Sequence, residues 1–88
     1  MEFEWDEAKR IGNLRKHGVD FAQVGAFDWN TMIEVADHRR AYGETRWQAL
    51  GMIDNRLHML IYTKRGSRTR VISLRKASRK EKAAYAES

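Results

Sequence analysis

The strongest structural signal in this chain lies between Arg65 and Arg79, where a turn, a strand and a helix start follow one another. Gly66-Ser67 predicts the turn, and the β-branched pair Val71-Ile72 predicts the strand. Ser78 and Glu81 have the spacing of a helix capping box. Six of these fifteen residues are Arg or Lys. A strand with so many cations is expected to face a polyanion rather than to build an ordinary core.

Charge is distributed unevenly along the chain. Residues 1–55 carry seven Lys or Arg and ten Asp or Glu, a net charge of −3, whereas residues 56–88 carry ten and two, a net charge of +8. A basic half on an otherwise balanced chain indicates a nucleic-acid face or a docking face for an acidic protein. A solvated basic helix without a partner is the alternative, and it is less favoured because the charges continue into a predicted strand.

Composition excludes several classes of protein. The length of 88 residues predicts a single domain, 1–88. The chain has no Cys, so it has neither disulfides nor thiolate metal sites, which is typical of a reducing cytoplasm. Its three histidines (His17, His38, His58) are scattered, so no metal site and no cofactor are expected. No apolar run approaches the ~18 residues of a membrane span.

Caps and hydrophobic periodicity predict an α+β fold. Asp6 caps a helix over residues 7–16 that Gly18 ends, and Asp20 with Gln23 forms the capping box of a second helix. Phe3-Glu4-Trp5 is either a short strand or an extended lead-in. The remaining predicted elements are strands at 32–36, 45–53, 57–63 and 69–75 and a helix at 79–86. We therefore expect two N-terminal helices packed on a roughly four-stranded antiparallel sheet, followed by a C-terminal helix.

Two expectations concern packing. The N-terminal helices should cover one face of the sheet with their apolar side chains, namely Trp5, Ile11, Leu14, Phe21 and Val24. Simple alternation along the last strand should place Arg70 with Ile72 and Leu74, and Arg75 with Val71 and Ser73 on the opposite face.

The chain also concentrates cations, imidazole and phenol groups that could act on RNA. These candidates are His17, Tyr62, Lys64, Arg65, Arg68, Arg70, Arg75, Arg79, Lys82 and Tyr85. Such groups can cleave RNA without a metal, because a base can deprotonate the 2′-OH, an acid can protonate the leaving 5′-oxygen, and cations can stabilise the phosphorane. The same groups would also grip a nucleic-acid backbone in a non-catalytic binding module.

Each candidate has a structural alternative. His17 could simply close the first helix, where an imidazolium suits the dipole. Arg70 and Arg75 could pair with acids across the sheet, although acids are scarce in this half. Tyr62 is more often a sheet aromatic than a proton donor. Arg79 opposes the dipole in a first helical turn, which favours a phosphate ligand or catalytic cation.

Two groups of residues resemble the signatures of the BrnT toxins of type II toxin–antitoxin modules. The first group contains Phe3-Glu4-Trp5-Asp6, Lys9, Asn13, Lys16-His17-Gly18-Val19 and Phe21. The second contains Gly51, Tyr62-Thr63-Lys64-Arg65, the run from Arg70 to Ala77, Arg79, Glu81 and Tyr85. Leu74 and the segment from Trp29 to Gly43 depart from the family pattern.

The resemblance implies a RelE-like fold and a metal-independent endoribonuclease toxin that inhibits translation. It implies neutralisation by a cognate BrnA-type antitoxin that also binds operator DNA, an RNA substrate that could be ribosome-associated, and no membrane. The catalytic residues would be His17, Tyr62, Arg70, Arg75 and Arg79. The RNA-binding residues would be Lys64, Arg65, Arg68, Lys82 and Tyr85. The alternative is a basic nucleic-acid- or protein-binding module without catalysis.

Overall fold

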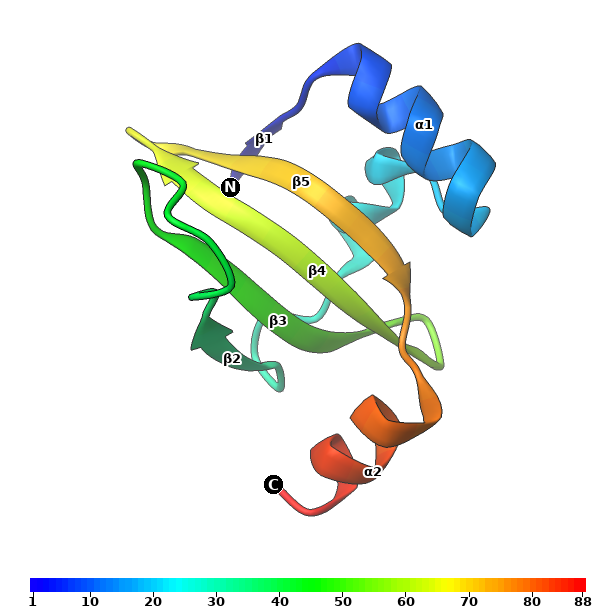
Figure 1. Cartoon of the computed structure of the whole chain (residues 1–88). Coiled ribbons are helices and arrows are strands. Elements are labelled where there is room, and N and C mark those ends of the chain that lie inside the picture. The colour runs from blue at the N-terminus through cyan, green and yellow to red at the C-terminus, as the bar shows by residue number, and fades with distance from the viewer.

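A five-stranded sheet forms the centre of the computed structural model, which describes residues 1–88 (Figure 1). The strand order is β1-β5-β4-β3-β2, and all neighbours are antiparallel except β1 and β5, which are parallel. The elements are β1 (Glu2–Glu4), α1 (Glu7–His17), η1 (Phe21–Ala26), β2 (Ile33–Ala36), β3 (Arg46–Ile53), β4 (Arg56–Arg65), β5 (Arg68–Lys76) and α2 (Arg79–Ala86). None of these helices has the length and apolar character needed to cross a membrane.

The α+β class is confirmed, but the prediction of a four-stranded antiparallel sheet was wrong. The short segment at Glu2–Glu4 is a fifth strand, and its parallel partner is the Arg68–Arg70 part of β5. A short strand was one of the two expectations for Phe3-Glu4-Trp5, but its pairing across more than sixty residues leaves no local trace in the sequence.

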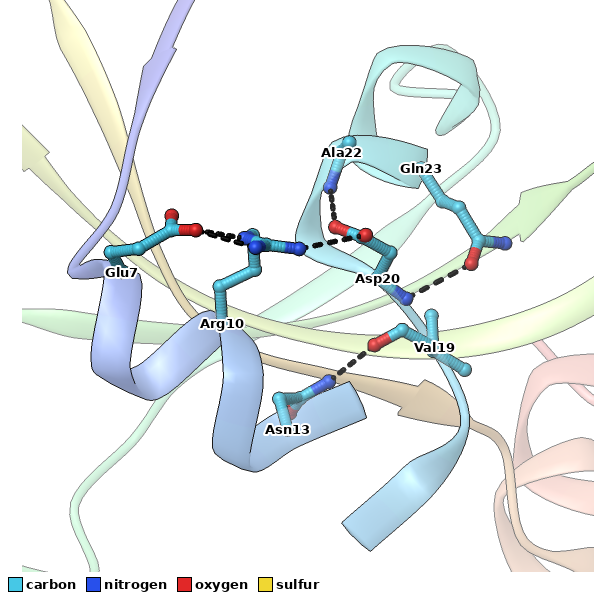
Figure 2. A network of polar contacts seen from close by, with 7 residues as sticks. All are labelled: Glu7, Arg10, Asn13, Val19, Asp20, Ala22 and Gln23. Carbon is cyan, nitrogen blue, oxygen red and sulfur yellow. Dashed lines mark hydrogen bonds and ion pairs between the residues drawn. The ribbon is translucent and has the colours of Figure 1, made fainter. Parts of the chain in front are cut away.

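The prediction of two N-terminal α-helices was also wrong. The second predicted helix is a 3₁₀ helix, η1, although its N-terminal cap is present. The Asp20 carboxylate accepts a hydrogen bond from the Ala22 N–H, and the Gln23 side-chain oxygen accepts one from the Asp20 N–H (Figure 2). A cap fixes where a helical segment starts, not how far it extends. This segment contains Val24 and Gly25, which are weak helix formers, and short helical pieces of this kind adopt 3₁₀ geometry.

The main core lies between η1 and one face of the sheet, and its ten buried members include Phe21, Leu60 and Leu74. Gly51 on β3 is required there, because a Cβ at this position would lie 2.4 Å from the ring of Phe27. Trp29 completes the cover over Phe3, Phe27 and Tyr62, with ring centroids 6.3, 4.9 and 5.3 Å away.

Helix α1 packs on β5 in a way that its apolar residues did not predict. Ile11 and Leu14, expected to cover the sheet, are 41% and 40% exposed, whereas the polar Asn13 is buried. The Asn13 amide donates to the carbonyls of Val19 (2.9 Å) and Leu74 (2.7 Å), and its oxygen accepts from the Leu74 N–H (3.2 Å). Asn13 therefore satisfies the edge of β5 much as a neighbouring strand would.

A β-bulge in β5 corrects the expected alternation. Ile61 pairs with Ser73 and Tyr62 with Val71, so Ile72 is an extra residue that has no partner on β4. Val71 and Leu74 consequently both lie in the main core, although they are three residues apart. The expectation that Arg70 and Arg75 lie on opposite faces was therefore wrong: both project from the face away from η1.

That second face carries a smaller apolar cluster of Leu50, Leu57, Met59 and Ile61, against which Tyr85 of α2 packs. The Tyr85 hydroxyl donates to the carbonyl of Thr31 (3.0 Å), which ties α2 to the segment before β2. Helix α2 spans the predicted residues, and both halves of its capping box, at Ser78 and Glu81, are present.

Candidate active site

Most of the arginines on and around the first half of β5 are paired with carboxylates. Arg70 lies 2.8 Å from Glu4, and Arg68 lies 3.5 Å from Glu2 and 3.8 Å from Glu4. The pairs form because β1 runs beside this half of β5, with Glu2 opposite Arg68 and Glu4 opposite Arg70. Arg65 similarly pairs with Glu44 (3.2 Å). These three predicted site residues are therefore largely neutralised.

Arg75 also has a carboxylate partner, but in a different setting. Its two terminal nitrogens donate to the two oxygens of Glu81 at 2.7 and 2.8 Å, a bidentate arrangement. The hydrogen bonds from Arg75 lower the pKa of Glu81 to about 2, with a further contribution from the Ser78 backbone, and the same contact raises the pKa of Arg75. Glu81 thus fixes Arg75 to the start of α2, while the Arg75 Nε makes no hydrogen bond within the chain.

His17 ends α1 and faces β5. Desolvation lowers its pKa first, and the positive charges of Lys16 and Arg75 lower it further. Near neutral pH this imidazole is uncharged and able to accept a proton.

A polar pocket of about 290 Å³ lies between α1 and β5 beside His17. We call it the α1–β5 pocket, and it is lined by Lys9, Gly12, Asn13, Lys16, His17, Ile72 and Ser73. No acidic residue lines it, in contrast to the surroundings of Arg68 and Arg70. Lys9, Lys16 and Ser73 were not predicted as site residues. The available signal was the seven-residue spacing of the two lysines, which places them on the helix side that carries Asn13.

Tyr62 is separated from this region. It is 4% exposed and belongs to the core on the face that η1 covers, whereas Arg75 projects from the other face. Its hydroxyl donates to Glu34 on β2, the edge strand farthest from β1. Burial is the larger cause of the raised pKa of Tyr62, and this hydrogen bond is the second. The structure therefore does not bring Tyr62 together with His17 and Arg75.

The remaining predicted site residues are dispersed. Lys64 donates to the Thr69 hydroxyl (2.9 Å), and Tyr85 is held by Thr31. Arg79 and Lys82 are exposed at α2 and form no ion pair. Of the predicted site residues, His17 lines the α1–β5 pocket and Arg75 follows two residues after Ser73 of its lining, whereas the others lie outside this region.

A larger hollow of about 430 Å³ lies beside the β3–β4 turn and includes His58 and Lys76 in its lining. His58 is 3% exposed and its Nδ1 lies 2.8 Å from the Arg56 carbonyl, so this imidazole has a structural role. No three His, Cys, Asp or Glu side chains cluster closely enough to hold a metal ion.

Comparison with known proteins gives one family. A model described as "Ribonuclease toxin, BrnT, of type II toxin-antitoxin system" matches residues 5–81. The matched segment contains α1, the whole of β2 to β5 and the capping box of α2. No curated protein matches the chain significantly.

Proposed function

The chain belongs to the BrnT family of ribonuclease toxins of type II toxin–antitoxin systems, and from this premise we propose that it is an endoribonuclease that cleaves RNA without a metal ion. Cleavage would inhibit translation, and a cognate antitoxin would neutralise it. The proposal centres on His17 and Arg75, with the other predicted site residues in supporting roles or outside the site.

The observation that carries the proposal is the position of His17 in the wall of the α1–β5 pocket, which has no acidic lining and whose Ser73 lies two residues before Arg75 on β5. The lowered pKa of His17, due first to desolvation and then to Lys16 and Arg75, suits a general base near neutral pH. Arg75 is oriented by its bidentate contact with Glu81 and would stabilise charge on the phosphorane.

The reaction follows from these two groups. His17 removes the proton from a ribose 2′-OH, whose oxygen attacks the adjacent phosphorus. The bond from phosphorus to the 5′-oxygen breaks, this oxygen takes up a proton from solvent, and His17 releases the proton that it accepted to solvent. The products are a 2′,3′-cyclic phosphate and a 5′-hydroxyl, and no water molecule is consumed. Arg79 is exposed at the start of α2 and would contact the RNA backbone outside the reacting phosphate.

Several finer points belong to the same proposal. The antitoxin would be of the BrnA type and would connect the toxin to operator DNA, and the chain would act in the cytoplasm on free or ribosome-associated RNA. Tyr62 would have a packing role rather than a proton-transfer role, because its hydroxyl is committed to Glu34 on the other face.

The test is incubation of the purified chain with RNA in EDTA, followed by analysis of the fragment ends. We expect 2′,3′-cyclic phosphate ends, and a loss of cleavage of about 10²-fold or more when the base is removed by His17→Ala. His38→Ala is the matched control, because it removes an exposed imidazole from the loop before β3 and should leave the rate unchanged.

Two results would count against the proposal. RNA binding without fragments would favour the non-catalytic binding module. Fragments that disappear in EDTA and return with a divalent cation would overturn metal independence.

A further inference from the structure

The α1–β5 pocket contains four polar side chains that the fold leaves unused. Lys9, Lys16, His17 and Ser73 form no side-chain hydrogen bond and no ion pair within the chain. The amide of Asn13, which also lines the pocket, is fully occupied by Val19 and Leu74. The pocket therefore has a rigid inner wall and a set of free donors.

Helix α1 and strand β5 place these donors around one pocket. Lys9 and Lys16 are two helical turns apart and flank Gly12, which has no side chain to fill the space between them. Across the pocket, the bulge at Ile72 directs Ser73 to the side of the sheet that carries Arg75. The imidazole of His17 also lines the pocket.

The donor set selects the chemistry of a ligand. Two ammonium groups, a hydroxyl and an imidazole, with no carboxylate in the lining, suit an anion with several oxygens. The volume of about 290 Å³ is roughly that of ten water molecules, which exceeds what a phosphate group needs and leaves room for part of a sugar.

We propose that the α1–β5 pocket is a phosphate subsite, in which Lys9 and Lys16 bind non-bridging oxygens of an RNA phosphodiester and Ser73 donates a hydrogen bond to it. The subsite rests on the proposed ribonuclease function, because it seats the phosphate beside the His17 base and within range of Arg75. It assigns substrate binding to the lysines of α1 rather than to the arginines of the first half of β5.

The test uses NMR titration of the His17 imidazole, first with inorganic phosphate and then with a short 2′-deoxyoligonucleotide, which lacks the attacking hydroxyl and is not cleaved. An anion in the pocket faces His17 together with Lys9, Lys16 and Arg75, and it should raise the pKa of His17 by roughly half a unit or more. Lys9→Ala combined with Lys16→Ala should remove this response and weaken oligonucleotide binding by about tenfold.

Arg15→Ala is the matched control, because it removes a cation from the same helical turn as Lys16 but from outside the pocket lining. It should leave the His17 response to phosphate intact. An equal loss of the response in Arg15→Ala and in the lysine variant would overturn the pocket in favour of general helix charge.

The two proposals fail separately. Cleavage of RNA by a chain whose His17 does not respond to phosphate would overturn the subsite and retain the ribonuclease. A response that depends on Lys9 and Lys16 in a chain that never cleaves RNA would retain a phosphate site and overturn its assignment to catalysis.

Discussion

The two halves of β5 both carry cations, but their surroundings differ. Beside the first half runs β1, which contributes Glu2 and Glu4 and neutralises Arg68 and Arg70. Strand β1 ends opposite Arg70, and from there the edge of β5 is covered by α1, which contributes lysines and Asn13 instead. The groups that flank β5 thus change from the carboxylates of β1 to the lysines of α1 within a few residues.

This difference shows what a density of cations in a sequence can and cannot establish. The basic residues of β5 were visible as a group, but the acids that neutralise them lie more than sixty residues earlier in the chain. Charge that is already paired contributes little to binding a polyanion, whereas unpaired charge beside a pocket contributes more. Arg75 is itself paired with Glu81, but the lysines beside the second half of β5 are unpaired, so this half is the better candidate for chemistry.

The largest expected effect is on RNA cleavage, and it compares one arginine from each half of β5. Arg75→Ala should lower the kcat/KM for RNA cleavage by about 10²-fold, because a donor to the phosphorane is lost. Arg70→Ala should lower it less than about fivefold, because that guanidinium lies beside β1 and away from the α1–β5 pocket. Single-turnover cleavage assays provide both values.

Glu81 is left without its partner in Arg75→Ala, so the double variant Arg75→Ala/Glu81→Ala serves as the control for folding. Equal losses in the Arg70 and Arg75 variants would remove the distinction between the halves.

A second prediction concerns the edge that Asn13 covers. Asn13→Ala should lower the free energy of unfolding by about 2–4 kcal/mol, because it leaves the buried Leu74 N–H and two carbonyls without partners. Urea unfolding measures this loss. Asn30→Ala, which removes an exposed amide without a side-chain hydrogen bond, should stay within about 0.5 kcal/mol of the parent. A similarly small loss for Asn13→Ala would mean that the edge of β5 is held by other contacts.

The Arg75–Glu81 pair predicts a pH dependence of stability. The pKa of Glu81 is lowered to about 2 from an ordinary 4.5, so its contribution is complete above the unfolded value and is lost as the pH falls through the folded one. The pair is partly exposed, which limits the contribution to about 1–2 kcal/mol. Glu81→Gln should therefore be less stable than the parent by this amount at pH 7, and the difference should shrink toward zero near pH 2. A difference that stays constant with pH would contradict an ionic origin.

The smallest expected effect comes from removing the Glu4 carboxylate that pairs with the arginines in the first half of β5. Glu4→Gln frees Arg70 and partly frees Arg68, so affinity for a 2′-deoxyoligonucleotide should rise about two- to threefold at low ionic strength. Fluorescence anisotropy measures this change. Glu87→Gln is the matched control, since it alters net charge equally at an exposed position without an ion pair. Equal gains in both variants would attribute the effect to net charge alone.

The parts of the fold that the sequence predicted are those with local causes. Helix α2 has its predicted bounds because Ser78 and Glu81 form a self-contained cap, and β4 is central because both of its faces are apolar. The parallel pairing of β1, the bulge at Ile72 and the burial of Asn13 each depend on a distant partner, and no local pattern encodes them.

The same division applies to the site. His17 and Arg75 were selected by residue type and by family resemblance, but their proximity required the packing of α1 on β5. Tyr62 was selected on the same grounds and lies in the core, because residue type does not reveal which face of a strand is covered. Lys9 and Lys16 were overlooked because lysines on a helix surface are ordinary until a neighbouring strand forms a hollow beside them.

The extra residue in β5 has a consequence for how this surface is assembled. Because two residues rather than one lie between Val71 and Leu74, regular alternation alone would not put Leu74 in the core and Arg75 on the basic face. Without the bulge, every residue after Ile72 would change face, so that Leu74 would leave the main core and the Arg75 guanidinium would be directed at the interior. The bulge absorbs the extra residue, and one strand can therefore supply both an apolar face and a charged one.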